Sequence, residues 1–386
     1  MLLRRKKQMK NMDASERVVE NDLGMMDQPY LILTLILVVI GLLVLFSASY
    51  ARAYYKTGNS ASYFTSQLLF AVVGVIAMFF ISRVPYEWYR KWSLIIYAVT
   101  ILFLLAVLVP GIGVKVNGAR RWINLGFTNF QPSEIAKFAM ILMLSIVMSS
   151  FQKEVRSLKT LLFCGVVIGV IAVLLILEPH FSATIIIGSV ALCMMLIGGV
   201  NWKYLLALVV VAGGALLILL LTGGYTSDRI MAWQNPEADP LDKGLQILQS
   251  EYAIGSGGLL GLGFGKSRQK YLYLPEEHND YIFAIACEEL GFIGAVGILI
   301  LFALLIIRGY WIAMHARDRF SMLMATGLTT LLAVQVILNV AVVTNLLPAT
   351  GISLPFFSSG GTALMMQLGE CGVVLNISRS ISQRPK

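Results

Sequence analysis

Ten runs of mostly apolar residues divide this chain, and each has roughly the length needed to cross a membrane. A helix needs about 20 such residues to span the hydrocarbon core of a bilayer. Of the 386 residues, 58% are hydrophobic and only 13% are charged, whereas soluble domains carry about 25% charged residues. The sequence therefore predicts an all-α polytopic membrane protein with about ten transmembrane helices. The runs cover about 31–50, 66–82, 94–109, 135–150, 158–177, 181–199, 203–221, 281–307, 322–343 and 360–377.

Basic residues near the two ends predict the orientation of these helices, because cytoplasmic loops carry an excess of lysine and arginine. The two ends contain Arg4, Arg5, Lys6, Lys7, Lys10, Arg379, Arg384 and Lys386. An even number of spans returns both ends to one side. We therefore expect cytoplasmic tails at 1–25, which looks disordered, and at 379–386, on either side of a transmembrane domain at 26–378. The first run is not followed by a small-residue cleavage site, so it is expected to span the membrane.

The connection between the seventh and eighth runs, at 222–279, is too long for a simple turn and is external in this topology. Within it, residues 241–254 have the apolar spacing of an amphipathic helix. The glycine-rich stretch that follows carries Lys266 and Arg268, which we expect to contact an anionic ligand. It is not a Walker A motif, because the required first glycine would fall at Leu260.

The stretch LPEEHNDYIFAIACEEL at 274–290 is the most informative part of the chain. Its charged, turn-forming start brings Asp280 to the mouth of the eighth run, where an ionisable group is costly unless it has a function. His278 either tunes Asp280 or is a solvated loop histidine. Glu288 and Glu289 lie about two turns deeper, roughly 12 Å for Glu288, which is too far for a carboxylate pair with Asp280. We expect these two glutamates to be structural.

Basic residues also occur on the side that the topology makes external. Arg120 and Arg121 lie between the third and fourth runs, and Lys137 lies at the outer end of the fourth run. An anionic ligand at the outer face would explain them, and the alternative is that they bind lipid headgroups or cap helices. Glu134 lies three residues before Lys137, so the two can pair on one helix face. Lys137 could instead pair with Asp280.

The last run begins with Ser358 and Ser359, after a segment broken by Pro348 and Pro355. The N-terminal amides of such a helix favour an anion, and the alternative is a re-entrant loop that packs against the bundle. The three histidines fall in different loops and the four cysteines in apolar segments. This distribution supports neither a zinc site nor a disulfide framework.

Five motifs follow one another along the chain. They are NGARRWINLG at 117–126, FQPSEIAK at 130–137, EP at 178–179, YLPEEHNDYIFAIACEELGFIG at 273–294 and LPATGISLPFFSSGG at 347–361. In this order they resemble the SEDS family (shape, elongation, division and sporulation), and the resemblance extends from about Met26 to Ile377. The pattern is closer to the division-type FtsW and sporulation SpoVE branch than to RodA.

This resemblance implies a fold of ten transmembrane helices and a peptidoglycan glycosyltransferase that polymerises lipid II at the outer face of the bacterial cytoplasmic membrane. Family members act with a class B penicillin-binding protein, a transpeptidase. Other membrane proteins of the divisome are expected partners, and nucleic acid is not. The family's catalytic aspartate corresponds to Asp280, and its other motif residues correspond to Arg120, Arg121, Trp122, Glu134 and Lys137.

The residues and the family chemistry agree. Basic residues would neutralise a departing pyrophosphate. Asp280 would act as a base towards the acceptor hydroxyl, orient that hydroxyl, or hold a divalent cation (Mg or Mn); no other cofactor is expected. The ordinary aspartate pKa of about 3.9 is low for a base, so the sequence leaves these roles open. One alternative is a lipid II flippase, for which functional charge is expected near the bilayer midplane. The other is a non-catalytic scaffold, which would tolerate replacement of Asp280.

Overall fold

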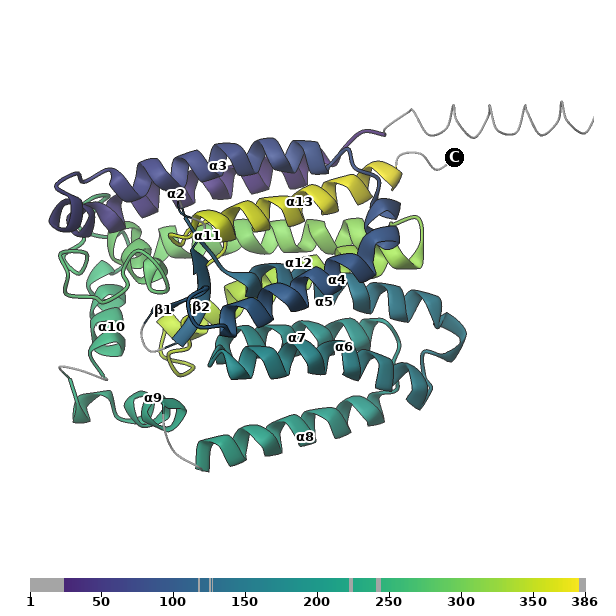
Figure 1. Ribbon diagram of the computed structural model, residues 1–386. Coiled ribbons are helices and arrows are strands. Elements are labelled where there is room, and N and C mark those ends of the chain that lie inside the picture. Colours follow the sequence, from purple (N-terminus) through teal and green to yellow (C-terminus); the bar gives the residue numbers. More distant parts are fainter. Residues whose placement is uncertain are drawn as a thin grey trace, which may run out of the picture.

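The computed structural model describes residues 24–116, 119–124, 126, 128–221, 225–240 and 244–381. They form a bundle of long helices that lie roughly side by side (Figure 1). Most of the predicted N-terminal tail and residues 382–386 of the predicted C-terminal tail lie outside the described residues.

Among the described residues, ten long helices coincide with the ten apolar runs. Seven of them are long and apolar enough to cross a membrane, whereas α7 has only 17 residues. The prediction of an all-helical protein with many membrane spans is confirmed. The ten helices are α2 (Gln28–Thr57), α3 (Ser62–Ile81), α4 (Tyr86–Leu108), α5 (Pro132–Ser150), α6 (Leu158–Leu177), α7 (Phe181–Ile197), α8 (Trp202–Leu221), α11 (Ile282–Met314), α12 (Arg319–Val343) and α13 (Gly361–Ile381).

Local capping sets the ends of several helices. The side chain of Asp27 accepts the N–H of Tyr30 at 3.0 Å at the start of α2, which satisfies a donor that the first turn leaves free. The same helix ends at Gly58, whose φ of 72° is favourable for glycine. At the start of α12, Asp318 and Ser321 form a capping box.

The described chain begins and ends on the same side of the bundle. The N–H of Asp27 donates to Ser378 Oγ at 3.0 Å, and Arg308 Nη2 lies 2.7 Å from Asp27 Oδ2. An even number of crossings requires this arrangement. The hairpin between α4 and α5, the connection between α8 and α11, and α10 lie at the opposite end (Figure 1).

That opposite end holds the short elements. A small antiparallel sheet, which the sequence analysis did not predict, has the order β1 (Gly113–Val116), β2 (Ala119–Asn124) and β3 (Asn129–Phe130). The long connection contains α9 (Tyr225–Gln234) and α10 (Leu245–Gly257). α10 covers most of the predicted amphipathic helix and packs against α11.

α11 is interrupted at Gly291, which has a φ of 68° and a ψ of −172°. The loop after α10 supplies partners for the backbone groups at this break. The N–H of Leu262 donates to the carbonyl of Glu288 at 3.0 Å, and the N–H of Phe292 donates to the carbonyl of Gly258 at 2.9 Å. The eighth predicted run is therefore two helical pieces rather than one. The break is tolerated because the loop satisfies backbone polar groups that must find partners within the chain.

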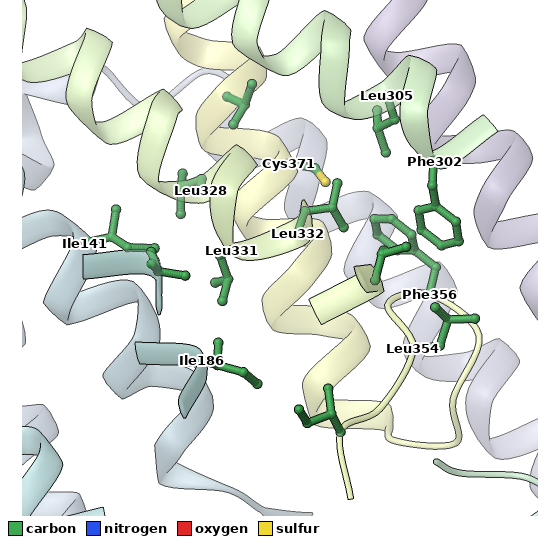
Figure 2. Close-up of a cluster of buried hydrophobic side chains, with 14 of the residues drawn as sticks. Ile141, Ile186, Phe302, Leu305, Leu328, Leu331, Leu332, Leu354, Phe356 and Cys371 are labelled. Atoms are coloured by element: carbon green, nitrogen blue, oxygen red, sulfur yellow. The ribbon is translucent and has the colours of Figure 1, made fainter. Parts of the chain in front are cut away.

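The hydrophobic core lies among α5, α7, α12 and α13. In Figure 2, Leu331 of α12 lies on the side of Ile141 and Ile186, and Leu332 lies on the side of Cys371. α13 also lies close to α3, because a Cβ added to Gly372 would be only 2.7 Å from the carbonyl oxygen of a residue of α3.

This close approach predicts that Gly372→Ala lowers thermal stability, because the new methyl group would meet the carbonyl oxygen of Met78 at 2.7 Å. Overpacking of this kind costs about 1–3 kcal/mol. Gly165→Ala on α6 is the matched control, since nothing lies within 4 Å of its added Cβ. The measurement is the unfolding temperature of each purified variant in detergent. Equal unfolding temperatures for the two variants would contradict the packing described here.

Candidate functional site

Asp280 lies in the loop immediately before α11, and backbone hydrogen bonds hold its peptide in place. Nδ2 of Asn339 on α12 donates to the carbonyl of Asp280 at 2.8 Å and to that of Ile352 at 2.7 Å. One amide therefore joins the loop before α11 to the loop before α13. The Asp280 side chain is half-buried, and its Oδ2 lies 3.3 Å from the position of a Cβ added to Gly351. The carboxyl group thus lies against the backbone of the loop before α13.

Ser358 and Ser359 connect the same two loops. Ser358 Oγ donates to the carbonyl of Asn279 at 2.8 Å, and the N–H of Ser359 donates to the carbonyl of His278 at 2.9 Å. The next N–H, that of Gly360, donates to a glutamine of α3. The amides that we expected to face an anion are therefore bound within the chain, and these two serines position the loop that carries Asp280.

The surroundings of Asp280 change its acidity. Burial raises the pKa of Asp280 to about 6. The charge of Glu276 acts in the same direction, whereas the positive charges of Arg229, His278 and Arg121 oppose it. Such an aspartate is ionised at neutral pH, yet it accepts a proton more readily than an exposed one with a pKa of about 3.9. The structure thus supplies a pKa shift that the sequence left open.

β2 separates the three residues of the predicted basic and aromatic loop. In the register of β2 with β1, Arg120 pairs with Lys115 and Trp122 pairs with Val114, so Arg121 has no partner residue on β1 and lies at a β-bulge. Arg121 Nη2 donates to the carbonyl oxygen of Pro179, and its charge acts on Asp280. Arg121 is therefore the member of this group that the fold brings towards Asp280.

A second guanidinium reaches Asp280 from α9. Arg229 Nη1 donates to the carbonyl of Ala349 at 2.6 Å, two residues before Gly351, and its charge acts on Asp280. The sequence analysis did not select Arg229. The signal was present, because Arg229 is one more basic residue on the side that the topology makes external.

Lys137 pairs with Glu134, with Nζ and Oε2 2.8 Å apart, and its side chain is only 3% exposed. This is one of the two partners that the sequence allowed. The charge of Lys137 also reaches His180. Burial, Arg121 and Lys137 lower the pKa of His180 to about 3, so this imidazole is neutral. Its Nε2 lies 3.3 Å from Nε2 of Gln131.

Glu178, at the end of α6, is a buried carboxyl group that the sequence analysis noted only as part of a motif. It is 1% exposed, and neither of its oxygens has a hydrogen-bond partner in the part of the chain that the structure describes. Burial raises the pKa of Glu178 to about 8, against the opposing charge of Arg121. Glu178 is therefore mostly protonated at neutral pH. It lies next to Pro179, whose carbonyl binds Arg121.

Glu288 and Glu289 hold the loop that follows α10. Glu289 Oε1 accepts from Lys270 Nζ at 2.9 Å and from Ser47 Oγ at 2.6 Å. Glu288 Oε1 accepts the N–H of Arg268 at 2.9 Å. Both carboxylates and Lys270 are buried. These interactions stabilise the loop at the break in α11.

The structure also gives the surroundings of Lys266, Arg268 and His278. The side chains of Lys266 and Arg268 are exposed, and neither is among the charges that act on Asp280. His278 is not a solvated loop histidine, because it is 5% exposed and its ring packs edge-on against Tyr63, with centroids 4.8 Å apart.

The described residues contain no group of three or more His, Cys, Asp or Glu side chains placed to hold a metal ion. The charges that act on Asp280 are those of Glu276, Arg229, His278 and Arg121, so one carboxylate faces it together with several positive groups. The residues present therefore do not fit a divalent cation held by the protein alone, and we derive no step through one.

The cell cycle protein family FtsW/RodA/SpoVE has a model that matches residues 27–383 of this chain. The chain is 42% identical over 350 residues to stage V sporulation protein E of Bacillus subtilis, covering 90% of this chain and 95% of that protein. It is 37% identical over 370 residues to the probable peptidoglycan glycosyltransferase FtsW of Trichlorobacter lovleyi, covering 96% of each.

Solved structures share the fold. One is a chain from a study of the structural coordination of polymerization and crosslinking by a peptidoglycan synthase complex. It matches with a TM-score of 0.79 at 24% identity, covering 93% of this chain and 99% of that one. The crystal structure of the rod shape determining protein RodA of Thermus thermophilus matches with a TM-score of 0.71 at 25% identity, covering 93% and 98%.

The burial of Glu178 predicts a pH-dependent effect of Glu178→Gln on stability. The folded pKa of about 8 exceeds the unfolded value of about 4.3, so the folded state holds a proton that the unfolded state releases. The stability of the unsubstituted protein therefore falls as pH rises between these values, by up to about 1.4 kcal/mol per pH unit. The neutral variant lacks this loss.

Unfolding temperatures measured in detergent at several pH values test this expectation. The unfolding temperature of Glu178→Gln, relative to that of the unsubstituted protein, should increase as pH rises towards 8. Glu154→Gln is the control, because Glu154 is exposed and its difference should stay flat. A flat difference for Glu178→Gln would show that Glu178 is not protonated in the folded protein.

Proposed function

We propose that Asp280 is the catalytic residue of this chain. The chain belongs to the FtsW/RodA/SpoVE family of cell cycle proteins and is a peptidoglycan glycosyltransferase of the type that acts in cell division or sporulation. The observation that carries the proposal is a carboxyl group with a pKa raised to about 6 beside the guanidinium groups of Arg121 and Arg229. The carboxylate is suited to accept a proton, and the guanidiniums are suited to receive negative charge.

The proposed substrates are lipid II as donor and lipid II or a growing glycan strand as acceptor. A sugar hydroxyl oxygen of the acceptor forms a bond to the anomeric carbon of the donor. The bond from that carbon to the pyrophosphate oxygen breaks, and the pyrophosphate leaves with the bonding electrons. Asp280 takes the hydroxyl proton and later releases it to water. Because the leaving pyrophosphate is a stable anion that needs no proton, one catalytic carboxyl group is sufficient.

The arrangement of charge suits this reaction. A general base works best when its pKa lies near the working pH, and the pKa of about 6 brings Asp280 closer to neutrality while leaving it ionised. Arg121 and Arg229 are fixed in place by backbone carbonyls of Pro179 and Ala349. Donors that are positioned before the reaction stabilise developing charge without a further cost of reorganisation.

The proposed location of the reaction is the outer face of the bacterial cytoplasmic membrane, with both chain ends in the cytoplasm. The basic N-terminal residues support this orientation, and the loops around Asp280 lie at the end of the bundle opposite Asp27 and Ser378. The proposed partners are a class B penicillin-binding transpeptidase and other divisome membrane proteins. Similarity of fold to a chain from the peptidoglycan synthase complex study supports a partner of this kind.

The first test of the proposed function is Asp280→Asn, which should lower the rate of glycan polymerisation by about 10²–10⁴-fold, the usual contribution of a general base. The assay supplies purified protein and its transpeptidase with labelled lipid II and measures glycan length by gel electrophoresis. Glu251→Gln is the control, because Glu251 is an exposed acid in the same external connection. Its carboxylate accepts a hydrogen bond from Asn345. Normal polymerisation by Asp280→Asn would refute the assignment of Asp280 as the catalytic residue, whereas only a lack of polymerisation by the unsubstituted protein would favour the flippase or scaffold alternative.

The second test is the pH dependence of the same reaction. Only ionised Asp280 accepts a proton, so the initial rate should fall about tenfold for each pH unit below the pKa of about 6 and should be level just above it. An unburied aspartate would place this limb near pH 4, at the ordinary pKa of about 3.9. A rate that stays constant down to about pH 4.5 would therefore show that Asp280 is not the base described here.

A further inference from the structure

Glu370 is a carboxyl group near the midpoint of α13 (Gly361–Ile381), one of the helices that coincide with the predicted spans. The rise of about 1.5 Å per residue places it roughly 13 Å along the helix from Gly361. An ionisable side chain at such a depth is costly unless it is paired or neutral, and it usually has a function. The proposed glycosyl transfer does not use Glu370.

Glu370 lines a small cavity inside the bundle, with a volume of about 10 Å³. Polar side chains from three helices share this lining: Tyr30 of α2, Gln335 of α12 and Gln367 of α13. Leucines of α12 form part of the apolar wall, and Figure 2 shows Leu332 close to Cys371 on this side of α12. A cavity of this size is just large enough for one water molecule, provided that polar groups bind it.

Two of the polar groups around the cavity are already occupied. Gln367 Oε1 accepts the N–H of Phe356 at 3.0 Å, and the hydroxyl of Tyr30 lies 3.7 Å from Cys371 Sγ. By contrast, neither Glu370 nor Gln335 forms a hydrogen bond within the described part of the chain.

This lack of partners is notable because Gln335 is only 3% exposed. A buried amide without a hydrogen bond costs about 1–3 kcal/mol. Two unpartnered polar groups that face one cavity therefore point to a shared ligand.

The charges near Glu370 do not balance if every group is ionised. Glu134 and Lys137 of α5 lie within electrostatic reach of Glu370, but Lys137 is already paired with Glu134 at 2.8 Å. From the other elements, α2 contributes the neutral hydroxyl of Tyr30 and α12 contributes the neutral amide of Gln335. One ammonium group thus faces two carboxyl groups. Glu370 is half-buried within a helix that coincides with a predicted span, and an uncompensated charge there is costly, so a neutral second carboxyl group is favoured.

We propose that Glu370 is an intramembrane proton-binding site, in which the protonated carboxyl group and the Gln335 amide are joined by one water molecule in the cavity. A protonated carboxyl group offers one donor and retains acceptors, and an amide offers both. A single water molecule satisfies both side chains and leaves no net charge at the centre of α13. This site is separate from the proposed glycosyl transfer and does not depend on it.

Infrared spectroscopy of the purified protein tests the proposal directly, because the C=O stretch of a protonated carboxyl group is separate from that of a carboxylate. The measurement is made at neutral pH in a Glu178→Gln background, since Glu178 also holds a proton there. Protein labelled with ¹³C-glutamate distinguishes glutamates from aspartates. We expect a protonated-glutamate band that is absent from Glu178→Gln/Glu370→Gln. An unchanged spectrum after Glu370→Gln would overturn the proposal.

Two further variants keep the test informative if Glu370→Gln fails to fold. Gln335→Leu should move the band to higher frequency, because the carboxyl group loses the water-bridged partner. Glu134→Gln should weaken the band at neutral pH, because Lys137 then has Glu370 as its remaining acidic neighbour and one ammonium group balances one carboxylate. Glu154→Gln, on the exposed turn after α5, should change neither. A band that is unaffected by both Gln335→Leu and Glu134→Gln would contradict the assignment.

The nature of the bound ion is tested by recording the infrared band at constant pH, first in choline chloride and then in sodium chloride. A proton site keeps its band in both salts. Loss of the band in sodium would mean that the cavity binds a metal cation in place of the proton, and this result would overturn the proposal.

Discussion

Backbone polar groups inside a bilayer find no water, and the position of the loop that carries Asp280 depends on how this chain meets that constraint. The break in α11 at Gly291 frees N–H and carbonyl groups, and the loop after α10 binds them. The carboxylates of Glu288 and Glu289 then bind the same loop through Lys270 and backbone amides. Because this loop leads directly to Asp280, a requirement of the membrane also fixes where this carboxyl group lies.

The site combines ionisable groups whose surroundings give them different protonation states at one pH. Burial brings the pKa of Asp280 to about 6, and that of Glu178 to about 8. Neighbouring positive charges and burial keep His180 neutral. The charge of Arg121 acts on all three groups, after burial as the largest cause. An ionised base, a protonated acid and a neutral imidazole can therefore coexist near neutral pH.

Much of this structure could be predicted from the sequence because apolar runs determine where helices cross a membrane. All ten runs coincide with helices, and the predicted family and activity are confirmed. The break at Gly291 could not be foreseen, because it depends on hydrogen bonds to a loop that is distant in sequence. Only the packing of α10 against α11 brings that loop next to the break. The hairpin was missed as well, and with it the β-bulge that sets Arg121 apart from Arg120. Arg229 was overlooked although it is a basic residue on the side expected to be external, because only the tertiary structure shows that its charge acts on Asp280.

Gly351 carries no side chain, yet the structure tightly restricts what can stand at that position. Its φ of +75° is strained for any other residue, and an added Cβ would lie 3.3 Å from Asp280 Oδ2. A genetic screen for loss of function would therefore recover changes at this glycine alongside changes at the aspartate itself. The exposed Lys266 faces no such restriction. Evolutionary drift in related chains should accordingly be slow at the glycine and fast at the lysine, although only the lysine carries a charge.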